Sequence, residues 1–173
     1  MEELDQEGIR NLDADGWFNF LHDAYFRWKY TAPNRYASTT AILRRRCSDA
    51  PGRAMLHRIK QKLLTVERSQ IAEAIETAKQ IPGLGTAGAS GLLAVLYLTL
   101  FGTVDQFAVK ALHAIPNLPD AELIAQMKPE DLTTLNAVVL VRIMRRQAKL
   151  LSDALGSPWT PRAVDKILWT YGR

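Results

Sequence analysis

The sequence predicts an all-α fold, and three observations support this prediction. Apolar side chains recur at intervals of three and four residues, several segments are rich in strong helix formers, and the breaks between segments contain helix-capping or helix-ending residues. No segment combines sustained apolar–polar alternation with turn residues at its ends, as strands do. The 173 residues therefore fit a single helical domain, 1–173, with room for two small lobes.

The first half of the chain is predicted to form four helices. Large apolar side chains recur at helical spacing in the first: Trp17, Phe20, Leu21, Ala24, Tyr25 and Trp28. Pro33 ends this helix, because it moves the residue before it out of helical geometry. Ser38 is a suitable N-cap for the next helix. The expected ranges are about 15–30, 38–47, 53–66 and 67–80, with a break at 49–52.

The second half begins at a turn rich in glycine, Pro82-Gly83-Leu84-Gly85. A helix of small and apolar residues is expected after it, from Thr86 towards Leu100. Gly156 ends a long helix, and Thr160 followed by Pro161 is a strong signal for the start of the last one. The remaining expected ranges are about 103–114, 119–127 and 131–155.

Basic charge is concentrated in one part of the chain. Residues 1–26 carry seven acids and one arginine, whereas residues 27–68 carry eleven lysines or arginines and two acids. Such clustering suits a polyanion, because each neutralised phosphate releases condensed counterions. A solvated basic face explains the charge equally well.

Other features narrow the class of protein. A single cysteine, Cys47, excludes an intrachain disulfide and a zinc or iron–sulfur site built from cysteines. The three histidines are far apart and lack partners at metal-ligand spacing, so we expect no metal and no cofactor. The acidic N-terminus is unlike a secretory signal, and the longest apolar run, 91–101, is too short to cross a membrane. We therefore expect a cytoplasmic protein.

The most informative stretch is the turn Ile81-Pro82-Gly83-Leu84-Gly85-Thr86. Gly83 and Gly85 permit a tight turn with positive φ, and they leave backbone N–H groups uncovered at the start of the next helix. The amides around Thr86 and Ala87 would then form an anion site for a DNA phosphate. Supporting cations are expected from the basic segment, namely Arg44, Arg45, Arg46, Arg58 and Lys62. A plain helix–helix connection is the alternative.

Residues 67–115 resemble the helix-hairpin-helix superfamily of DNA glycosylases. The order of the elements carries the resemblance: a helix, the Pro-Gly-Leu-Gly turn, a small-residue helix, and then Asp105, twenty residues after Gly85, with Lys110 following. The C-terminal segment 158–169 is similar to the end of small bacterial proteins described as 8-oxoguanine-glycosylase-like. The resemblance implies a catalytic role for Asp105, DNA contact by Lys110, a DNA substrate with a flipped base, and other DNA-processing or defence proteins as partners.

One departure from the family bears on the chemistry. Members that also cleave the DNA strand carry a lysine two positions after the second hairpin glycine, and here that position is Ala87. The resemblance therefore implies a monofunctional enzyme, in which Asp105 stabilises a cationic sugar and activates water. Lys110 lies about 140° around a helix from Asp105 and so is not expected to replace the missing amine. A simpler role for Asp105 is the N-cap of the helix from Gln106, and both roles are compatible.

Three functions remain open at this level. The first is a DNA N-glycosylase, the second a non-catalytic DNA- or lesion-binding module of the same fold, and the third a helical interaction protein. The basic segment and the hairpin argue against the third. Most aromatic side chains near the N-terminus are expected in the core, with Trp28, Tyr30 and Tyr36 as candidates for base stacking. No motif identifies the base.

Overall fold

The structure is a computed structural model that describes residues 6–173, so the acidic residues 1–5 lie outside the described part. The prediction of an all-α fold is confirmed, since all the regular structure among the described residues is helical. The first elements are α1 (Gln6–Asn11), α2 (Ala14–Asn19), the π-helix η1 (Phe20–Tyr25), α3 (Phe26–Lys29), α4 (Pro33–Cys47) and α5 (Ala50–Leu64). The others are α6 (Ile71–Lys79), α7 (Thr86–Leu96), α8 (Gln106–His113), α9 (Ala121–Ala125), α10 (Thr134–Leu155) and α11 (Pro161–Gly172).

The helix expected over 15–30 is present as the continuous run of α2, η1 and α3. Asp13 caps its start, with the side chain accepting a hydrogen bond from Gly16 N at 2.7 Å. Its apolar stripe enters the core, and Trp17 stacks on Phe20 with ring centroids 5.3 Å apart. The π-helical middle was not predicted. There the Phe26 N–H donates to Leu21 O, five residues back. This wider turn holds one residue more than an α-helical turn does.

Two predicted helix starts were wrong for the same reason. Helix α4 begins at Pro33 instead of Ser38, and α5 begins at Ala50, inside the expected break. Proline lacks an N–H, but the first turn of a helix does not need one, so Pro33 and Pro51 start helices here instead of separating them. Asp49 supplies the N-cap of α5 and accepts a hydrogen bond from Gly52 N at 2.8 Å.

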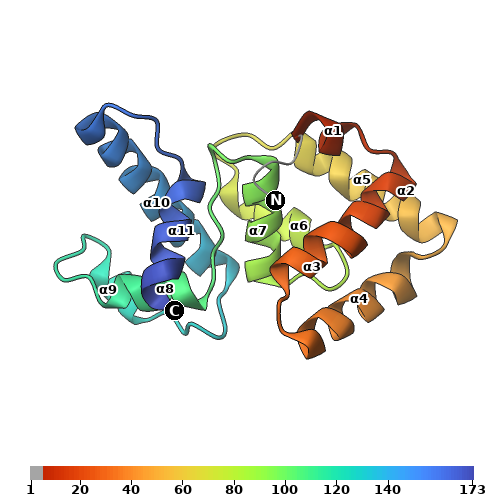
Figure 1. Cartoon of the computed structure of the whole chain (residues 1–173), viewed down its shortest axis with the longest axis horizontal. Coiled ribbons are helices and arrows are strands. Elements are labelled where there is room, and N and C mark those ends of the chain that lie inside the picture. The colour runs from red at the N-terminus through yellow and green to blue at the C-terminus, as the bar shows by residue number, and fades with distance from the viewer. Residues whose placement is uncertain (1–5) are drawn as a thin grey trace.

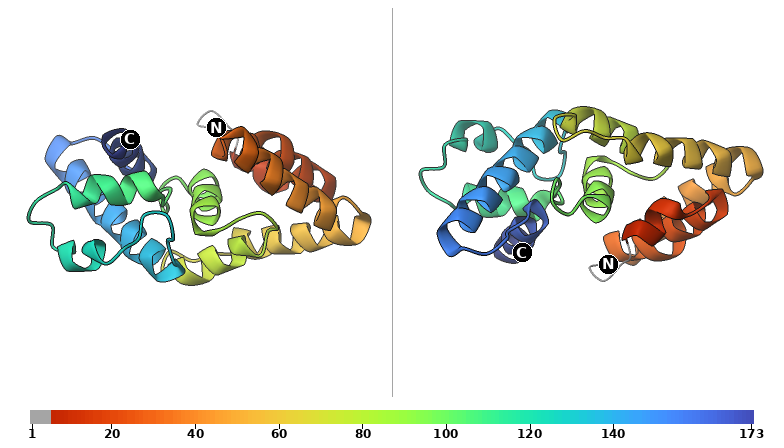
Figure 2. Two further views of the ribbon diagram at one scale, coloured as in Figure 1. Left: turned by 90° about the horizontal axis from the view of Figure 1, so that it is seen from below. Right: turned by 90° about the horizontal axis from the view of Figure 1, so that it is seen from above.

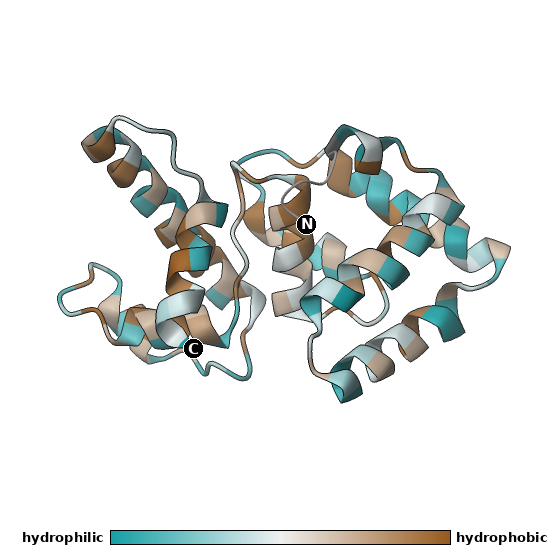
Figure 3. Ribbon diagram, in the orientation of Figure 1, coloured by the Kyte–Doolittle hydropathy of each residue, from teal (hydrophilic) through white to brown (hydrophobic). Residues whose placement is uncertain are grey.

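The helices form two groups with the hairpin between them. Helices α1–α5 lie on one side and α8–α11 on the other, while α6 and α7 stand in the middle (Figures 1 and 2). Helix α7 is buried on all sides from Gly88 to Leu96, and its apolar residues stand out in Figure 3. A helix that is apolar all round belongs in a core. The two groups therefore share α7 as a common central element.

The C-terminal helices follow the predicted signals closely. Gly156 adopts a left-handed conformation with φ of 64° after α10, and Thr160 caps α11, accepting a hydrogen bond from Ala163 N at 3.1 Å. Pro161 is the first residue of α11. Among residues 6–173, no helix is both long and apolar enough to cross a membrane.

Candidate nucleic-acid interface and active site

The hairpin turn connects α6 to α7 and is closed by a hydrogen bond from Leu84 N to Ile81 O at 3.1 Å. Gly83 has a φ of +95°, a conformation that residues with a Cβ rarely adopt. A Cβ at this position would also lie 2.9 Å from Thr39 O and 3.1 Å from the Phe26 ring. Gly83 is therefore required by the turn itself.

Gly85 has a different role from the one expected. Its φ is −94°, its ψ is −171°, and a Cβ built on it would meet no atom within 4 Å. The expectation of positive φ at both glycines is thus wrong for Gly85, which sits in ordinary extended backbone as the N-cap of α7. It provides no side chain, so the first N–H groups of α7 receive no side-chain cap. Exposed backbone, free amides and the helix dipole together leave room for an anion here.

The small residues of α7 allow two tyrosines of the N-terminal helix to approach closely. The Tyr25 hydroxyl donates to Gly88 O at 2.5 Å, and the Tyr30 hydroxyl donates to Gly83 O at 3.2 Å. A Cβ at Gly88 would lie 2.5 Å from the Tyr30 hydroxyl, and one at Gly91 2.8 Å from the Tyr25 hydroxyl. Gly88 and Gly91 thus leave room for the two tyrosine hydroxyls.

The predicted DNA-binding cations of the basic segment are exposed on α4 and α5. The three arginines end α4: Arg44, Arg45 and Arg46. Arg58 and Lys62 are exposed on α5, and Lys62 lines a hollow together with Glu73 and Glu76. Carboxylates at that hollow would repel a phosphate, so the surroundings of Lys62 do not favour contact with the DNA backbone.

One basic residue that the sequence analysis did not select acts on a tyrosine at the turn. Arg35 lies in the first turn of α4, and its charge acts on the Tyr30 hydroxyl, which itself contacts the hairpin. Burial raises the pKa of Tyr30 to about 12, and Arg35 opposes this increase. Helix α4 packs beside the turn, with Thr39 O 2.9 Å from a Cβ built at Gly83. Sequence spacing does not predict this packing, so it could not single out Arg35.

Asp105 is the N-cap of α8, as the simpler interpretation predicted. Its Oδ1 accepts hydrogen bonds from Phe107 N at 3.0 Å and Ala108 N at 3.1 Å. All of its hydrogen bonds within the described residues use Oδ1, so Oδ2 remains open to a ligand. The side chain is half-buried. A carboxylate with one oxygen held by two amides has a defined orientation and can still act through the other oxygen.

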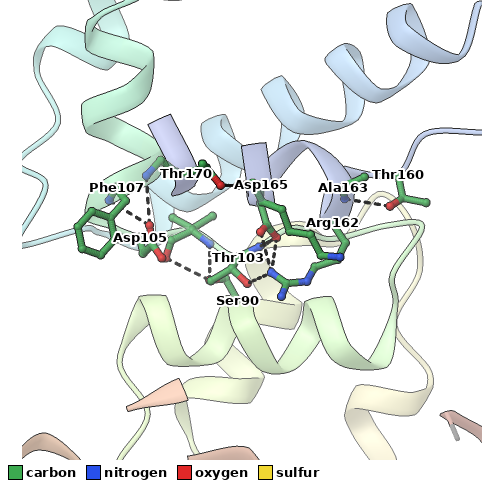
Figure 4. A network of polar contacts seen from close by, with 12 residues as sticks. Ser90, Thr103, Asp105, Phe107, Thr160, Arg162, Ala163, Asp165 and Thr170 are labelled. Carbon is green, nitrogen blue, oxygen red and sulfur yellow. Dashed lines mark hydrogen bonds and ion pairs between the residues drawn. The ribbon is translucent and has the colours of Figure 1, made fainter. Parts of the chain in front are cut away.

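A polar network holds the backbone that leads to Asp105 (Figure 4). Ser90 on α7 accepts a hydrogen bond from Val104 N at 2.9 Å, and Asp165 on α11 accepts one from Thr103 N at 2.5 Å. Arg162 donates to Asp165 Oδ1 at 2.6 Å and to the Thr103 hydroxyl at 3.1 Å. The network thus connects the helix after the hairpin, the backbone before Asp105 and the last helix.

Close packing adds to these hydrogen bonds. A Cβ at Gly102 would lie 2.5 Å from Met144 Sδ and 2.7 Å from Pro161 O. Burial raises the pKa of Asp165, Arg162 lowers it, and the nearby charge of Asp105 raises it further.

Lys29 is a site residue that the sequence analysis missed. It is the last residue of α3, and its charge interacts with both Asp105 and Asp165. Burial lowers the pKa of Lys29, the two carboxylates raise it, and Arg162 lowers it. Trp28, its neighbour, has the Arg162 guanidinium 5.3 Å from its ring centroid. The end of α3 therefore faces the cluster formed by the C-terminal helices.

The remaining predicted residues lie at the edges of this region. Lys110 is exposed, with Nζ 5.7 Å from the centroid of the Phe107 ring. Trp28, Tyr30 and Tyr36 are half-buried, so each retains surface that a base could contact. No group of three or more histidine, cysteine or acidic side chains is arranged for a metal ion in the part of the chain that the structure describes.

Comparisons of this chain with protein-family models, with curated proteins and with solved structures found no match.

Proposed function

We propose that the protein is a DNA N-glycosylase of the helix-hairpin-helix type, which releases a damaged or modified base by hydrolysis. The observation that carries this proposal is the fixed relation between Asp105 and the hairpin. Ser90 lies in the helix that the hairpin starts, and it binds the backbone one residue before Asp105. One DNA strand would then place a phosphate at the hairpin amides and a sugar beside Asp105.

The geometry suits the chemistry of a glycosidic bond. Departure of the base leaves positive charge on the sugar, and a carboxylate beside it stabilises that charge. In Asp105, Oδ1 is occupied by the amides of α8 and Oδ2 is available for the sugar or for a water molecule. The hairpin amides at Thr86 and Ala87 would hold a phosphate of the same strand.

A non-catalytic module that binds DNA or a lesion is the second candidate. The alanine at position 87 favours it, because that position carries no nucleophile. Two surface hollows lie away from Asp105: one is lined by Leu112 and Ile124 among others, and the other by residues of α5 and α6. The folded protein without DNA is equally compatible with binding alone.

The two candidates are separated by a base-release assay. Duplexes carrying 8-oxoguanine, uracil, alkylated purines or mismatches are incubated with the protein and then treated with alkali, which cuts abasic sites. Strand cleavage that disappears in Asp105→Asn supports the glycosylase. Binding to a lesion duplex without cleavage of any substrate supports the binding module.

A further inference from the structure

The end of the last helix packs on the start of α8, next to the cap at Asp105. A Cβ at Gly172 of α11 would lie 2.7 Å from the carbonyl carbon of Phe107 and 3.0 Å from its Cα, so only a glycine permits this approach. The Phe107 N–H is one of the two amides that donate to Asp105. Figure 4 shows Thr170 of α11 close to Phe107 and Asp105. The surface formed by α8 and the end of α11 is therefore continuous with the candidate active site.

Two aromatic rings meet on this surface. Phe107 of α8 and Trp169 of α11 form an edge-to-face pair, with ring centroids 6.0 Å apart and ring planes at 78°. Trp169 nevertheless keeps 39% of its surface exposed, and Phe107 is half-buried. Because Gly172 fixes the end of α11 against the Phe107 backbone, the two rings lose little conformational freedom when a ligand binds.

Each ring has a cation beside it. Lys110 Nζ lies 5.7 Å from the centroid of Phe107. Arg173 Cζ lies 4.9 Å from the centroid of Trp169, and both basic side chains are exposed. Helices α8 and α11 contain a single carboxylate between them, that of Asp165, and it is buried. The charged side chains that these two helices expose are therefore all basic.

Exposed aromatic rings beside cations, without acidic neighbours on the same helices, have the chemistry that binds a single nucleic-acid strand. The rings stack on bases, and the cations neutralise phosphates and offer guanidinium planes for further stacking. A duplex does not suit this surface, because its bases already stack on one another and present only their edges in the grooves. A purely structural contact between α8 and α11 would explain the pair of rings, but it would require neither the exposure of Trp169 nor a cation beside each ring.

We propose that Phe107 and Trp169, together with Lys110 and Arg173, form a binding site for unpaired nucleotides, whose bases stack on the rings and whose phosphates contact the cations. The inference goes beyond the proposed function, because such a strand needs no damaged base and no bond is broken. It gives the molecule a contact with nucleic acid in the C-terminal group of helices, separate from the hairpin amides. A strand bound there would pass next to Asp105.

The test measures the binding of a fluorescent single strand of about twelve thymidines, a length within the range that stacking sites cover. A strand with the same sugars and phosphates but no bases separates stacking from charge, and a uridine strand shows whether RNA is bound as well. Wild-type protein is expected to bind the thymidine strand at least about fivefold more tightly than the baseless strand, the lower end of the contribution of one base–aromatic stack. Trp169→Ala should remove this preference and leave the affinity for the baseless strand unchanged. Trp169→Phe, which keeps a ring, should retain most of it.

Two further variants separate the contributions of shape and charge. Leu135→Ala is the matched control, because it shortens another exposed apolar side chain, on α10, and it should bind both strands as the wild type does. Lys110→Ala should reduce the slope of log affinity against log salt by about 0.7, the value for one phosphate of a single strand. Thermal unfolding confirms that each variant is folded. The comparison of strands on the wild type and the salt slope of Lys110→Ala do not depend on whether Trp169→Ala folds.

Equal affinity of the wild type for the two strands, or an undiminished preference in Trp169→Ala, overturns the inference. A wild-type dimer that Trp169→Ala converts to a monomer, without any preference for bases, would also overturn it and would assign the surface to a second copy of this chain. The thymidine strand contains no damaged base, so a failure of base release leaves this binding unaffected. Absence of strand binding, in turn, leaves the base-release assay to decide the proposed function.

Discussion

The stability of the protein should depend strongly on a side chain at Gly83 and hardly at all on one at Gly85. Gly83→Ala places a Cβ at a φ of +95°, where it also meets Thr39 O at 2.9 Å and the Phe26 ring at 3.1 Å. The left-handed backbone costs about 1–2 kcal/mol and the crowding about the same again. We expect the free energy of unfolding to fall by about 2–4 kcal/mol, which lowers Tm by roughly 5–15 °C for a chain of this size.

Gly85→Ala should leave stability nearly unchanged. The backbone conformation is accessible to alanine, and no atom lies within 4 Å of the new Cβ. A small loss as an N-cap and a small gain from restricting the unfolded chain each amount to about 0.5 kcal/mol, so they nearly cancel. Thermal unfolding of the two variants, followed by circular dichroism, compares them directly.

DNA binding should show the reverse order. Gly85→Val keeps the turn but places methyl groups beside the amides of α7, where a phosphate would approach. We expect weaker binding, and a slope of log affinity against log salt that is smaller by about 0.9, the value for one lost phosphate contact. Equal losses of Tm in the alanine variants would refute the structural argument, and unchanged affinity of Gly85→Val would refute the hairpin as a DNA contact.

Further substitutions test the network around Asp105. Asp105→Asn should abolish base release while DNA affinity and Tm stay nearly unchanged, since asparagine is an equally good N-cap; equal rates in both proteins would show that the carboxylate is only a cap. Ser90→Ala leaves Val104 N without its partner and should lower stability by about 1–3 kcal/mol, and an unchanged Tm would contradict this. Asp165→Asn removes an ionisable partner of Arg162. Because burial raises the pKa of Asp165 in the folded protein, the stability that this group contributes is greatest below its unfolded pKa and is lost as pH rises through its folded pKa. Asp165→Asn should therefore flatten the fall in Tm between pH 4 and pH 7 that the wild type shows, and an identical pH profile of Tm in the two proteins would contradict the raised pKa.

Local sequence signals predicted the features that depend on local chemistry. The Thr160–Pro161 start, the helix end at Gly156 and the cap at Asp105 were all predicted and are present. Each arises from interactions within a few residues, so the sequence contains the whole cause. The same holds for Gly83, whose positive φ follows from the tight turn.

The predicted helix starts were wrong where a proline is compatible with either the end or the start of a helix. Proline ends a helix when it lies inside one and begins a helix when it lies in the first turn. Pro33 and Pro51 begin helices here, and only the neighbouring elements decide between the two roles. The exchange of i+4 for i+5 hydrogen bonds in η1 leaves the apolar stripe nearly intact, so periodicity does not detect it.

The long-range part of the candidate site was inaccessible to sequence reasoning for a physical reason. Lys29 and Asp105 are far apart in the chain, yet the charge of Asp105 acts on Lys29, and the aliphatic part of Lys29 lies against Gly91 of α7. Sequence motifs place a catalytic amine by its spacing from the hairpin, and the residue at that spacing is Ala87. A side chain that approaches the hairpin helix from another helix, as Lys29 of α3 does at Gly91, leaves no such spacing in the sequence.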